Sequence, residues 1–499
     1  MDVPRRQSRF ERGDDVVVMK FGGTSVEDAG AIRRLIAIVR SRLDARPVIV
    51  VSALAGVTDQ LLEAGKAAAT GHLGSALAAV RDTYVRHEKL ADSLVEGSAY
   101  SALDRELRGE FRALESLLLD FESSRQLNGK RLDQLLGVGE CFSSRLVTEA
   151  LSQAGVAAAH VDARACIVTD AHHGRATPLT DECNIRIQDA LSPLLQSDQV
   201  PVLGGFIGST LDGEPTTLGR GGSDFSAAII GAALCASRIE IWTDVDGIMT
   251  ADPKLCSDAR MIRRMTFDEA EELARCGAKV LHPATLAPAR RENIPVLVLN
   301  SRRPESEGTE ISSRARSGDG ASAIVAKRKV TAIEIEAAQA VDSELLGAIF
   351  AIFDQHSCPV EVIATSFGRI SLLATPAVDV SAIAETLRGR ADVRWENHKA
   401  LVSVVGETVR REPEFGSRAY AAVSDVKVRV VGHGASEPMI ALLVDESRVE
   451  EVVQRLHALL FAKPETPADW GGVSVAYCKA GFSPQRDLFG KRRDESLPA

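Results

Sequence analysis

The sequence has 499 residues, with 59 Lys and Arg against 69 Asp and Glu, and therefore a formal net charge of −10. This charge argues against a dedicated nucleic-acid-binding protein, which needs a concentrated positive field. The apolar runs are far shorter than the roughly 20 residues of a membrane span, which argues against a membrane protein. At roughly 150 residues per domain, the length predicts about three domains.

Two further features of the sequence indicate the cellular compartment of the protein. Residues 1–15 lack the apolar core of a secretory signal and are predicted to form a disordered tail. Eight Cys residues are scattered without the short paired spacings of a zinc site or a disulfide framework. This pattern favours reduced thiols in the cytoplasm.

The first two thirds of the chain alternate between strand-like and helix-like segments. Continuous β-branched runs, apolar on both faces, predict buried strands of a largely parallel sheet at 16–19, 48–51, 200–203, 239–242 and 296–299. Helical patterns lie between them at 31–43, 59–69, about 75–125, 143–153, 224–237 and 266–277, the last opening with a Thr266–Glu269 capping box. This alternation predicts an α/β domain.

Smaller units follow a polar, Gly- and Ser-rich stretch at 301–320, which is predicted to be a linker. Strands are expected at 331–336, 360–364, 370–374, 400–405, 426–431 and 439–444, and helices at 343–356, 380–388, 416–423 and 446–460. The order predicts an approximate duplication of a βαββαβ unit, with a spare strand at 473–476. Residues 483–499 are predicted to form a second disordered tail.

The first motif with chemical content is Lys20-Phe-Gly-Gly-Thr-Ser25, directly after a predicted strand. Glycines let backbone N–H groups approach an anion closely, and Lys20 supplies a positive charge for a phosphate. The Lys precedes the glycines, so this is not the P-loop pattern. From the spacing alone, a phosphate site and a simple turn both remain open.

The second motif, Thr216-Thr-Leu-Gly-Arg-Gly-Gly-Ser-Asp224, places Arg220 among three glycines ahead of an Ala-rich helix. Ser223 and Asp224 are predicted to cap that helix. A guanidinium beside a helix N-terminus suits a carboxylate or a phosphate, and this interpretation is favoured over a flexible loop.

The remaining motifs are weak when each is taken alone. Trp242-Thr-Asp-Val-Asp-Gly247 and Val51-Ser-Ala-Leu-Ala-Gly-Val-Thr58 follow strands, where open α/β sheets bind ligands, but both could be turns. Glu140 is expected at the N-terminus of a helix starting at Cys141, a placement that the helix dipole explains by itself. In Gly277-Ala-Lys-Val-Leu-His-Pro283, Lys279 could be a solvated cation at a helix C-terminus.

Taken in order, these stretches resemble the aspartate kinases (aspartokinases) of the amino acid kinase superfamily. KFGGTSV, VVSALAGVTD, GGFIGS, TTLGRGGSD, WTDVDGIMTADP and GAKVLHP occur in that family's order and approximate spacing over residues 16–300. The layout of the C-terminal third is similar to a pair of ACT domains. The chain is closest to the monofunctional lysine-sensitive type, because no dehydrogenase domain follows.

The resemblance implies an amino acid kinase fold over 16–320, a mostly parallel central sheet with helices on both faces. Two α+β ACT domains of the ferredoxin-like βαββαβ type should follow, the first from 325–398 with 470–482 and the second from 399–469. ACT units of the family pair edge to edge, so a homodimer or a higher homo-oligomer is expected. An amino-acid effector at the ACT domains is also expected.

The implied reaction moves the γ-phosphoryl group of ATP to the β-carboxylate of L-aspartate, giving 4-phospho-L-aspartate on the route to lysine, threonine and methionine. A carboxylate with a pKa of about 3.9 is already ionised at neutral pH, so no general base is needed. Catalysis should then consist of positioning and charge neutralisation. Mg²⁺ should accompany ATP and be held mostly by its phosphates, without a dedicated protein metal site.

The family pattern also assigns roles to residues. Lys20 would neutralise the transferring phosphoryl group, and Asp224 would orient Lys20 or the substrate amine. Glu140 would accept the substrate ammonium, and Arg220 would clamp its α-carboxylate. The other substrate-binding residues would be Ser52, Thr58, Gly221, Gly222 and Ser223. The other ATP-binding residues would be Phe21, Gly22, Gly23, Thr243, Asp244, Met249, Lys254, Lys279 and Val280.

Departures from the family pattern lie mainly in the ACT region. Ser343-Glu-Leu-Leu346 replaces a Gly-Phe-Leu-like helix start, and Phe367 stands where an acid should hold the ammonium of an effector, with Glu361 nearby. Lysine feedback is therefore an open question. Two alternatives to a plain aspartate kinase follow: a kinase for a modified aspartate, or a catalytically silent amino-acid sensor. Intact Lys20, Glu140, Arg220 and Asp224 argue against the sensor.

Overall fold

The computed structural model describes residues 15–278, 283–313, 322–337 and 343–356, and then 358–461 with short gaps. Several predictions lie outside the described residues. They concern the tails at 1–14 and 483–499, the segment 470–482 with its strand at 473–476, the residues Lys279, Val280 and Phe367, and the side chain of Glu361.

An eight-stranded sheet in the order β3-β4-β2-β1-β7-β9-β10-β8 forms the centre of the first part, and the strands from β3 to β9 are parallel. The predicted α/β class and all five predicted strands are confirmed. The bounds are β1 Val17–Phe21, β2 Pro47–Val51, β3 Ala158–His160, β4 Val200–Gly204, β7 Arg238–Thr243, β8 Arg264–Thr266, β9 Val296–Asn300 and β10 Thr309–Ser312. The β10 strand overturns part of the predicted linker, because residues 309–311 pair with β9 and residues 310–312 pair with β8.

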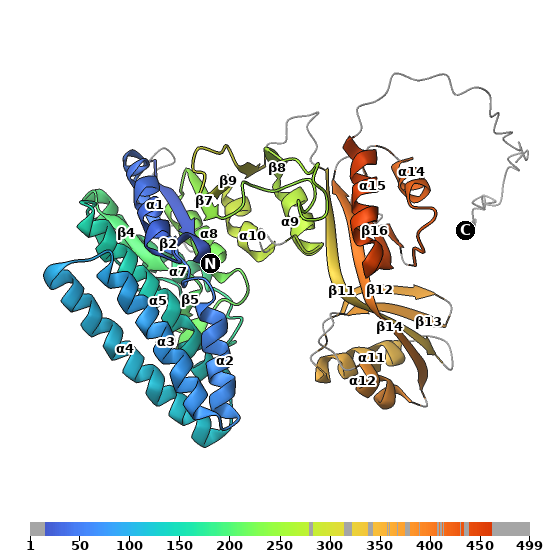
Figure 1. The fold of residues 1–499 in the computed structure, drawn as a ribbon, viewed down its shortest axis with the longest axis horizontal. Helices are drawn as coiled ribbons and strands as arrows, with labels where there is room; N and C mark the ends of the chain where they lie inside the picture. The colour runs from blue at the N-terminus through green and yellow to red at the C-terminus, as the bar shows by residue number, and fades with distance from the viewer. Residues whose placement is uncertain are drawn as a thin grey trace, which may run out of the picture. The chain divides into compact units, whose positions relative to one another are not determined.

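Helices cover both faces of this sheet, because alternate strand residues point to opposite sides. Val17 and Met19 pack in one core cluster and Val16 and Val18 in the other. The first face carries α1 Ala29–Arg40, α2 Val57–Ala69, α3 Leu73–Asp92, α4 Gly97–Ser124 and α5 Gly129–Gln153. The second carries α6 Ala163–Cys166, α7 Thr180–Gln196, α8 Gly222–Leu234, α9 Phe267–Arg275 and α10 Pro283–Glu292. Figure 1 shows α2 to α5 side by side as long helices.

Two predicted helix starts are wrong. The helix predicted at 143–153 begins already at Gly129, where the Asn128 side chain accepts the Arg131 N–H, so Glu140 lies in the helix interior. Ser223 and Asp224 do not cap α8, because the N-cap is Gly221 and both residues lie in the first turn. The Thr266–Glu269 capping box of α9 is confirmed. The α7 and α10 helices had no counterpart among the predicted segments.

The C-terminal part contains a six-stranded antiparallel sheet in the order β12-β13-β11-β14-β16-β15. Two 16-residue strands, β11 Ser322–Ala337 and β14 Ala391–Gly406, run through both of its halves and contain the shorter strands predicted at 331–336 and 400–405. Their pairing shifts register after Lys327, and the backbone is left-handed at Lys329 and His398. This point divides the sheet into two halves.

The first half is a βαββαβ unit, and the second repeats most of it. In the first, α11 Ser343–Gln355, β12 Val360–Ser366, β13 Arg369–Ala374 and α12 Val380–Leu387 lie between β11 and β14. In the second, α14 Phe415–Ala422, β15 Val431–His433, β16 Met439–Asp445 and α15 Val449–Phe461 follow β14. The predicted strand at 426–431 is wrong for 426–429, which is irregular. Within the described residues, no helix combines the length and apolar character needed to cross a bilayer.

Candidate active site

The carboxyl ends of β1, β2 and β7 meet at a point where the strand order reverses. The chain runs from β1 to β2 on one side, and after β4 it returns to β7 on the other side of β1. Ligands of open α/β sheets bind in the crevice at such a switch point. Lys20, Ser52 and Thr243 all lie at these strand ends, as the sequence predicted.

Lys20 and Asp224 form an ion pair at this edge. The Lys20 Nζ lies 2.6 Å from an Asp224 carboxylate oxygen, and their side chains are only 10% and 14% exposed. Asp224 lies in the first turn of α8, where unpaired N–H groups favour a carboxylate. The pair therefore connects β1 to α8 and fixes a positive charge beside the glycine loop.

The glycine loop does not offer all of its amides to a ligand. The Gly22 N–H already donates to the Trp242 carbonyl (3.0 Å), and the Trp242 ring stacks on Phe21. Gly23 opens a short 3₁₀ helix, η1 Gly23–Ser25, and among the described residues its N–H and that of Thr24 have no backbone acceptor. The loop can thus present two amides, beginning at Gly23 rather than at Gly22.

Glu140 is a buried carboxylate in the middle of α5. Its side chain lies next to the β2–α2 turn, and within the described part of the chain its Oε2 has no hydrogen-bond partner. Burial raises the pKa of Glu140 to about 8, although the Ala53 and Glu140 backbone N–H groups and the charge of Lys20 act in the opposite direction. An unpaired acceptor at such a site is satisfied best by a cationic donor.

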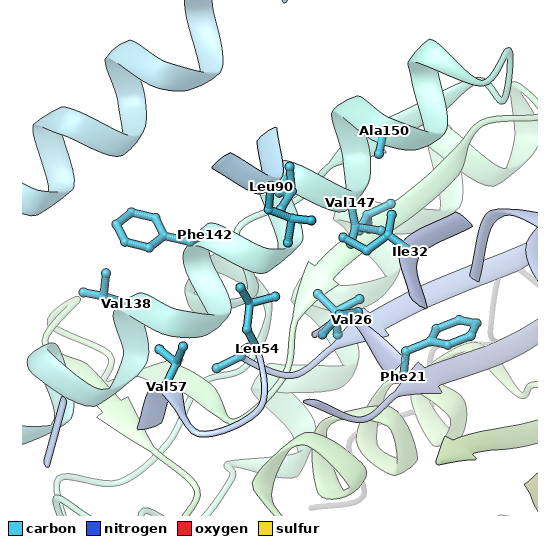
Figure 2. Packing of buried hydrophobic residues seen from close by; sticks show 14 of the residues in the cluster. Phe21, Val26, Ile32, Leu54, Val57, Leu90, Val138, Phe142, Val147 and Ala150 are labelled. Carbon is cyan, nitrogen blue, oxygen red and sulfur yellow. The ribbon is translucent and has the colours of Figure 1, made fainter. Parts of the chain in front are cut away.

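The α5 helix packs closely against its neighbours where it carries Glu140. Figure 2 shows Val138, Phe142 and Val147 along α5, with Leu54 of the β2–α2 turn and Val57, the first residue of α2, beside the helix. At Gly139 a Cβ atom would lie 2.6 Å from the Ala53 Cβ, so only glycine permits this close approach.

Ser52, Glu140 and Ser223 surround the end of β4. The Gly205 N–H donates to the Val51 carbonyl (2.8 Å), Gly204 lies against the Glu140 backbone, and Gly205 lies against Ser223. These three predicted residues are therefore brought together from the end of β2, from α5 and from α8. Gly204 and Gly205 were not among the predicted site residues, although a Gly-Gly pair directly after a predicted strand was the signal that could have identified them.

Arg220 lies on the loop before α8, directly before the N-cap residue Gly221. The backbone is left-handed at both Gly219 and Gly221, and Gly222 is the first residue of the helix. The Arg220 side chain is exposed and forms no ion pair with any residue that the structure describes. Its guanidinium is available to a ligand. Thr58, half-buried, lies in the first turn of α2.

The residues that the sequence predicts to bind the nucleotide are only partly brought together. Half-buried Thr243 is the last residue of β7, and exposed Asp244 follows it, beside the glycine loop. Met249 and Lys254 lie further along, on the excursion between β7 and β8, where Met249 pairs with Met261 and Lys254 is exposed.

The end of β9 belongs to the same edge and was missed. The Ser301 N–H donates to the Thr243 carbonyl (2.8 Å), and its hydroxyl accepts from Ser25 of η1 (2.8 Å). Asn300 donates to Asp246 (2.7 Å). The polar pair Asn-Ser after the apolar run at 296–299 was the available signal, because this run is one more strand of the same parallel sheet.

Comparisons with known proteins agree with this architecture. Residues 15–300 match the model of the amino acid kinase family, and residues 402–460 match an ACT domain. The lysine-sensitive aspartokinase 3 of Escherichia coli is 34% identical over 457 residues, which cover 90% of this chain and 99% of that protein. The chloroplastic aspartokinase 3 of Arabidopsis thaliana is 32% identical, over 93% of this chain and 84% of the relative.

Two solved structures of E. coli aspartokinase III are also similar. One is a complex with aspartate and ADP in the R-state, with a TM-score of 0.77 and 32% identity over 89% of this chain and 100% of the other. The second is a complex with lysine and aspartate in the T-state, with a TM-score of 0.75 and 32% identity over 90% of this chain and 100% of the other. The chain thus belongs to the amino acid kinase family and, within it, to the aspartokinases.

Proposed function

We propose that this chain transfers the γ-phosphoryl group of ATP to the β-carboxylate of L-aspartate, forming 4-phospho-L-aspartate and ADP. The observation that carries the proposal is the buried Glu140 carboxylate, whose Oε2 has no hydrogen-bond partner among the described residues, beside the Lys20–Asp224 pair. This arrangement offers a negative site for an ammonium and a positive site for a phosphoryl group. The E. coli relative that holds aspartate and ADP supports the same pair of ligands.

The aspartate subsite is proposed to recognise the groups on the α-carbon. Glu140 accepts the α-ammonium, and the exposed guanidinium of Arg220 binds the α-carboxylate through two parallel hydrogen bonds. Ser52, Thr58, Ser223 and the backbone of Gly221 and Gly222 complete this subsite. With both α-substituents held, the β-carboxylate is left free to react.

In the transfer step, a β-carboxylate oxygen forms a bond to the γ-phosphorus while the bond to the bridging oxygen breaks and ADP leaves. The nucleophile is already ionised, so no side chain has to remove a proton. Lys20 places its charge against the phosphoryl oxygens, and Asp224 keeps the ammonium of Lys20 in place. The charge of Lys20 therefore stabilises the phosphoryl group most strongly where negative charge accumulates during the transfer.

The nucleotide is proposed to lie along the ends of β1 and β7, against Phe21, Gly22, Gly23, Thr243 and Asp244, with Met249, Lys254, Lys279 and Val280 further along. Mg²⁺ is proposed to accompany it and to neutralise phosphate charge. No group of three or more His, Cys, Asp and Glu suited to a metal ion occurs among the described residues. The exposed Asp244 carboxylate and the phosphates themselves would therefore supply its ligands, with water.

The test is to incubate the purified chain with ATP, Mg²⁺ and aspartate in hydroxylamine, which traps an acyl phosphate as a hydroxamate. We expect a hydroxamate that depends on all three components. A panel of aspartate analogues is tested in parallel. An analogue with a higher kcat/KM than aspartate would show that the chain is a kinase for a modified aspartate instead. The absence of hydroxamate with every amino acid tested would favour a silent sensor.

Regulation, assembly and compartment are proposed on the same basis. The ACT part is proposed to bind an amino-acid effector and to pair two copies of the chain, and the lysine in the T-state E. coli structure supports an amino acid in that role. Titration of the activity with lysine, threonine and methionine identifies the effector, and light scattering measures the assembly. Cys141, Cys166, Cys183, Cys235, Cys256 and Cys358 are free thiols, which supports a reducing compartment such as the cytoplasm.

A further inference from the structure

Asp133 is a second buried carboxylate on α5, and it has no part in the proposed phosphoryl transfer. Its side chain is fully buried. Both of its oxygens lie 3.0 Å from the Gly174 N–H, one lies 2.9 Å from the His173 Nδ1, and the other accepts from the Thr217 hydroxyl. A carboxylate that takes three donors holds those donors tightly.

These donors belong to the two segments that border the Arg220 loop. Thr217 ends β6 Pro215–Thr217, three residues before Arg220, and its carbonyl accepts the Ala176 N–H (2.9 Å). At Gly219, where φ is +75°, a Cβ atom would lie 3.1 Å from the Gly174 carbonyl oxygen. The chain leading to Arg220 therefore rests on the segment that Asp133 holds.

The α5 helix therefore positions both Glu140 and, through Asp133, the Arg220 loop. Asp133 and Glu140 are seven residues apart, so they lie on one side of α5, about 10 Å apart along its axis. In the proposed function, Glu140 and Arg220 bind two groups carried by a single carbon atom. Their separation must therefore be set within narrow limits.

We propose that Asp133 is a positioning residue for substrate recognition. Through Thr217, His173 and Gly174, it sets the Arg220 loop at a fixed distance from Glu140, and so selects a substrate with an ammonium and a carboxylate on one carbon. This inference rests on the proposed function and adds the residue that aligns the two halves of the aspartate subsite.

The test is the kinetics of Asp133→Asn, which keeps the side-chain shape but removes the charge and one acceptor. We expect the KM for aspartate to rise about tenfold, while kcat and the KM for ATP stay near the wild-type values. Thr217→Val, which removes one donor, should change the KM for aspartate in the same direction but less. Asn128→Ala is the matched control, because it removes the side-chain cap of α5 but none of the hydrogen bonds of Asp133.

A double-mutant cycle separates positioning from a general structural effect. If Asp133 acts through Arg220, Asp133→Asn should add little to the high aspartate KM of Arg220→Ala. Increases that multiply would overturn the inference, as would an unchanged aspartate KM in Asp133→Asn. Should Asp133→Asn not fold, Thr217→Val decides by the same cycle. A wild-type chain that yields no hydroxamate contradicts the proposed function instead.

Discussion

Lys20 is the residue on which the proposed chemistry depends most directly. Lys20→Ala removes the one charge that Asp224 holds at the strand end, and the loss of such a group typically costs about 10²-fold or more in kcat. Steady-state kinetics and a thermal unfolding curve would be measured together. Lys66→Ala is the matched control, because Lys66 lies on the surface of α2 and, among the described residues, forms an ion pair with Glu63 alone. A Lys20→Ala enzyme with near-normal kcat would exclude the assigned role.

Glu140 makes aspartate binding depend on pH. With a pKa of about 8, Glu140 of the free enzyme is largely protonated at pH 6.5, and an ammonium can bind only after that proton leaves. The KM for aspartate should therefore rise as the pH falls from 8 to 6.5, by up to about tenfold per unit. Glu140→Gln should have a high KM that does not change over this range.

The stability of the ligand-free protein offers an independent check on Glu140. Its pKa lies above the ordinary value of 4.5, so the folded state binds more protons than the unfolded state between that value and about 8. The contribution of Glu140 to stability is present below pH 4.5 and is lost as the pH rises through 8. Glu140→Gln should therefore gain stability over the wild type at pH 9 relative to pH 6, and an identical pH dependence of both melting curves would contradict the raised pKa.

At the scale of elements, the close contact between α5 and the β2–α2 turn positions Glu140. Gly139→Ala would place a methyl group 2.6 Å from the Ala53 Cβ, and such overpacking costs about 1–3 kcal/mol. We expect a lower melting temperature and a lower kcat/KM for aspartate.

The matched control for this substitution is Gly109→Ala on α4, where a Cβ atom meets no heavy atom within 4 Å. The same substitution there should stabilise the protein by about 0.5–1 kcal/mol, because alanine favours the helical backbone. If both variants changed stability alike, helix propensity rather than close packing would explain the effect at Gly139.

Sequence reasoning succeeded for elements that carry their own signal. β-Branched runs predicted β1, β2, β4, β7 and β9, and the Thr266–Glu269 box predicted the start of α9. It failed at Glu140, because Gly137 and Gly139 weaken the local helix signal, whereas in the structure these glycines allow α5 to lie close against Ile207 and Ala53. It also missed Asp133, since a lone acid gives no hint of donors that lie 40 and 84 residues away.

At the scale of the whole molecule, the segment after β7, which carries two of the proposed ATP-binding residues, packs on the second half of the C-terminal sheet. Ala251, Leu255 and Cys256 belong to the same hydrophobic cluster as Val402 and Val453. The Gln454 side chain donates to the Leu255 carbonyl (3.1 Å), and Thr250 hydrogen-bonds to His457 of α15 (2.9 Å). The neighbours of Lys254 are therefore part of a regulatory core.

Leu255→Ala tests this connection. A cavity at a buried leucine costs about 2–5 kcal/mol, so the melting temperature should fall. Because Lys254 is adjacent, the KM for ATP should rise while the KM for aspartate stays unchanged. Leu459→Ala, at a partly buried member of the same cluster on α15, is the control for a loss of packing alone. Equal effects of both variants on the KM for ATP would contradict a special role of the segment.

The two 16-residue strands β11 and β14 determine how the C-terminal part unfolds. Each strand pairs within both halves of the sheet, and their register shifts only at the junction near Lys329 and His398. Neither half can lose these strands without exposing the core of the other. The two halves should therefore melt in a single cooperative transition, and the amide hydrogens of β11 and β14 should exchange with solvent last, at the free energy of that common opening.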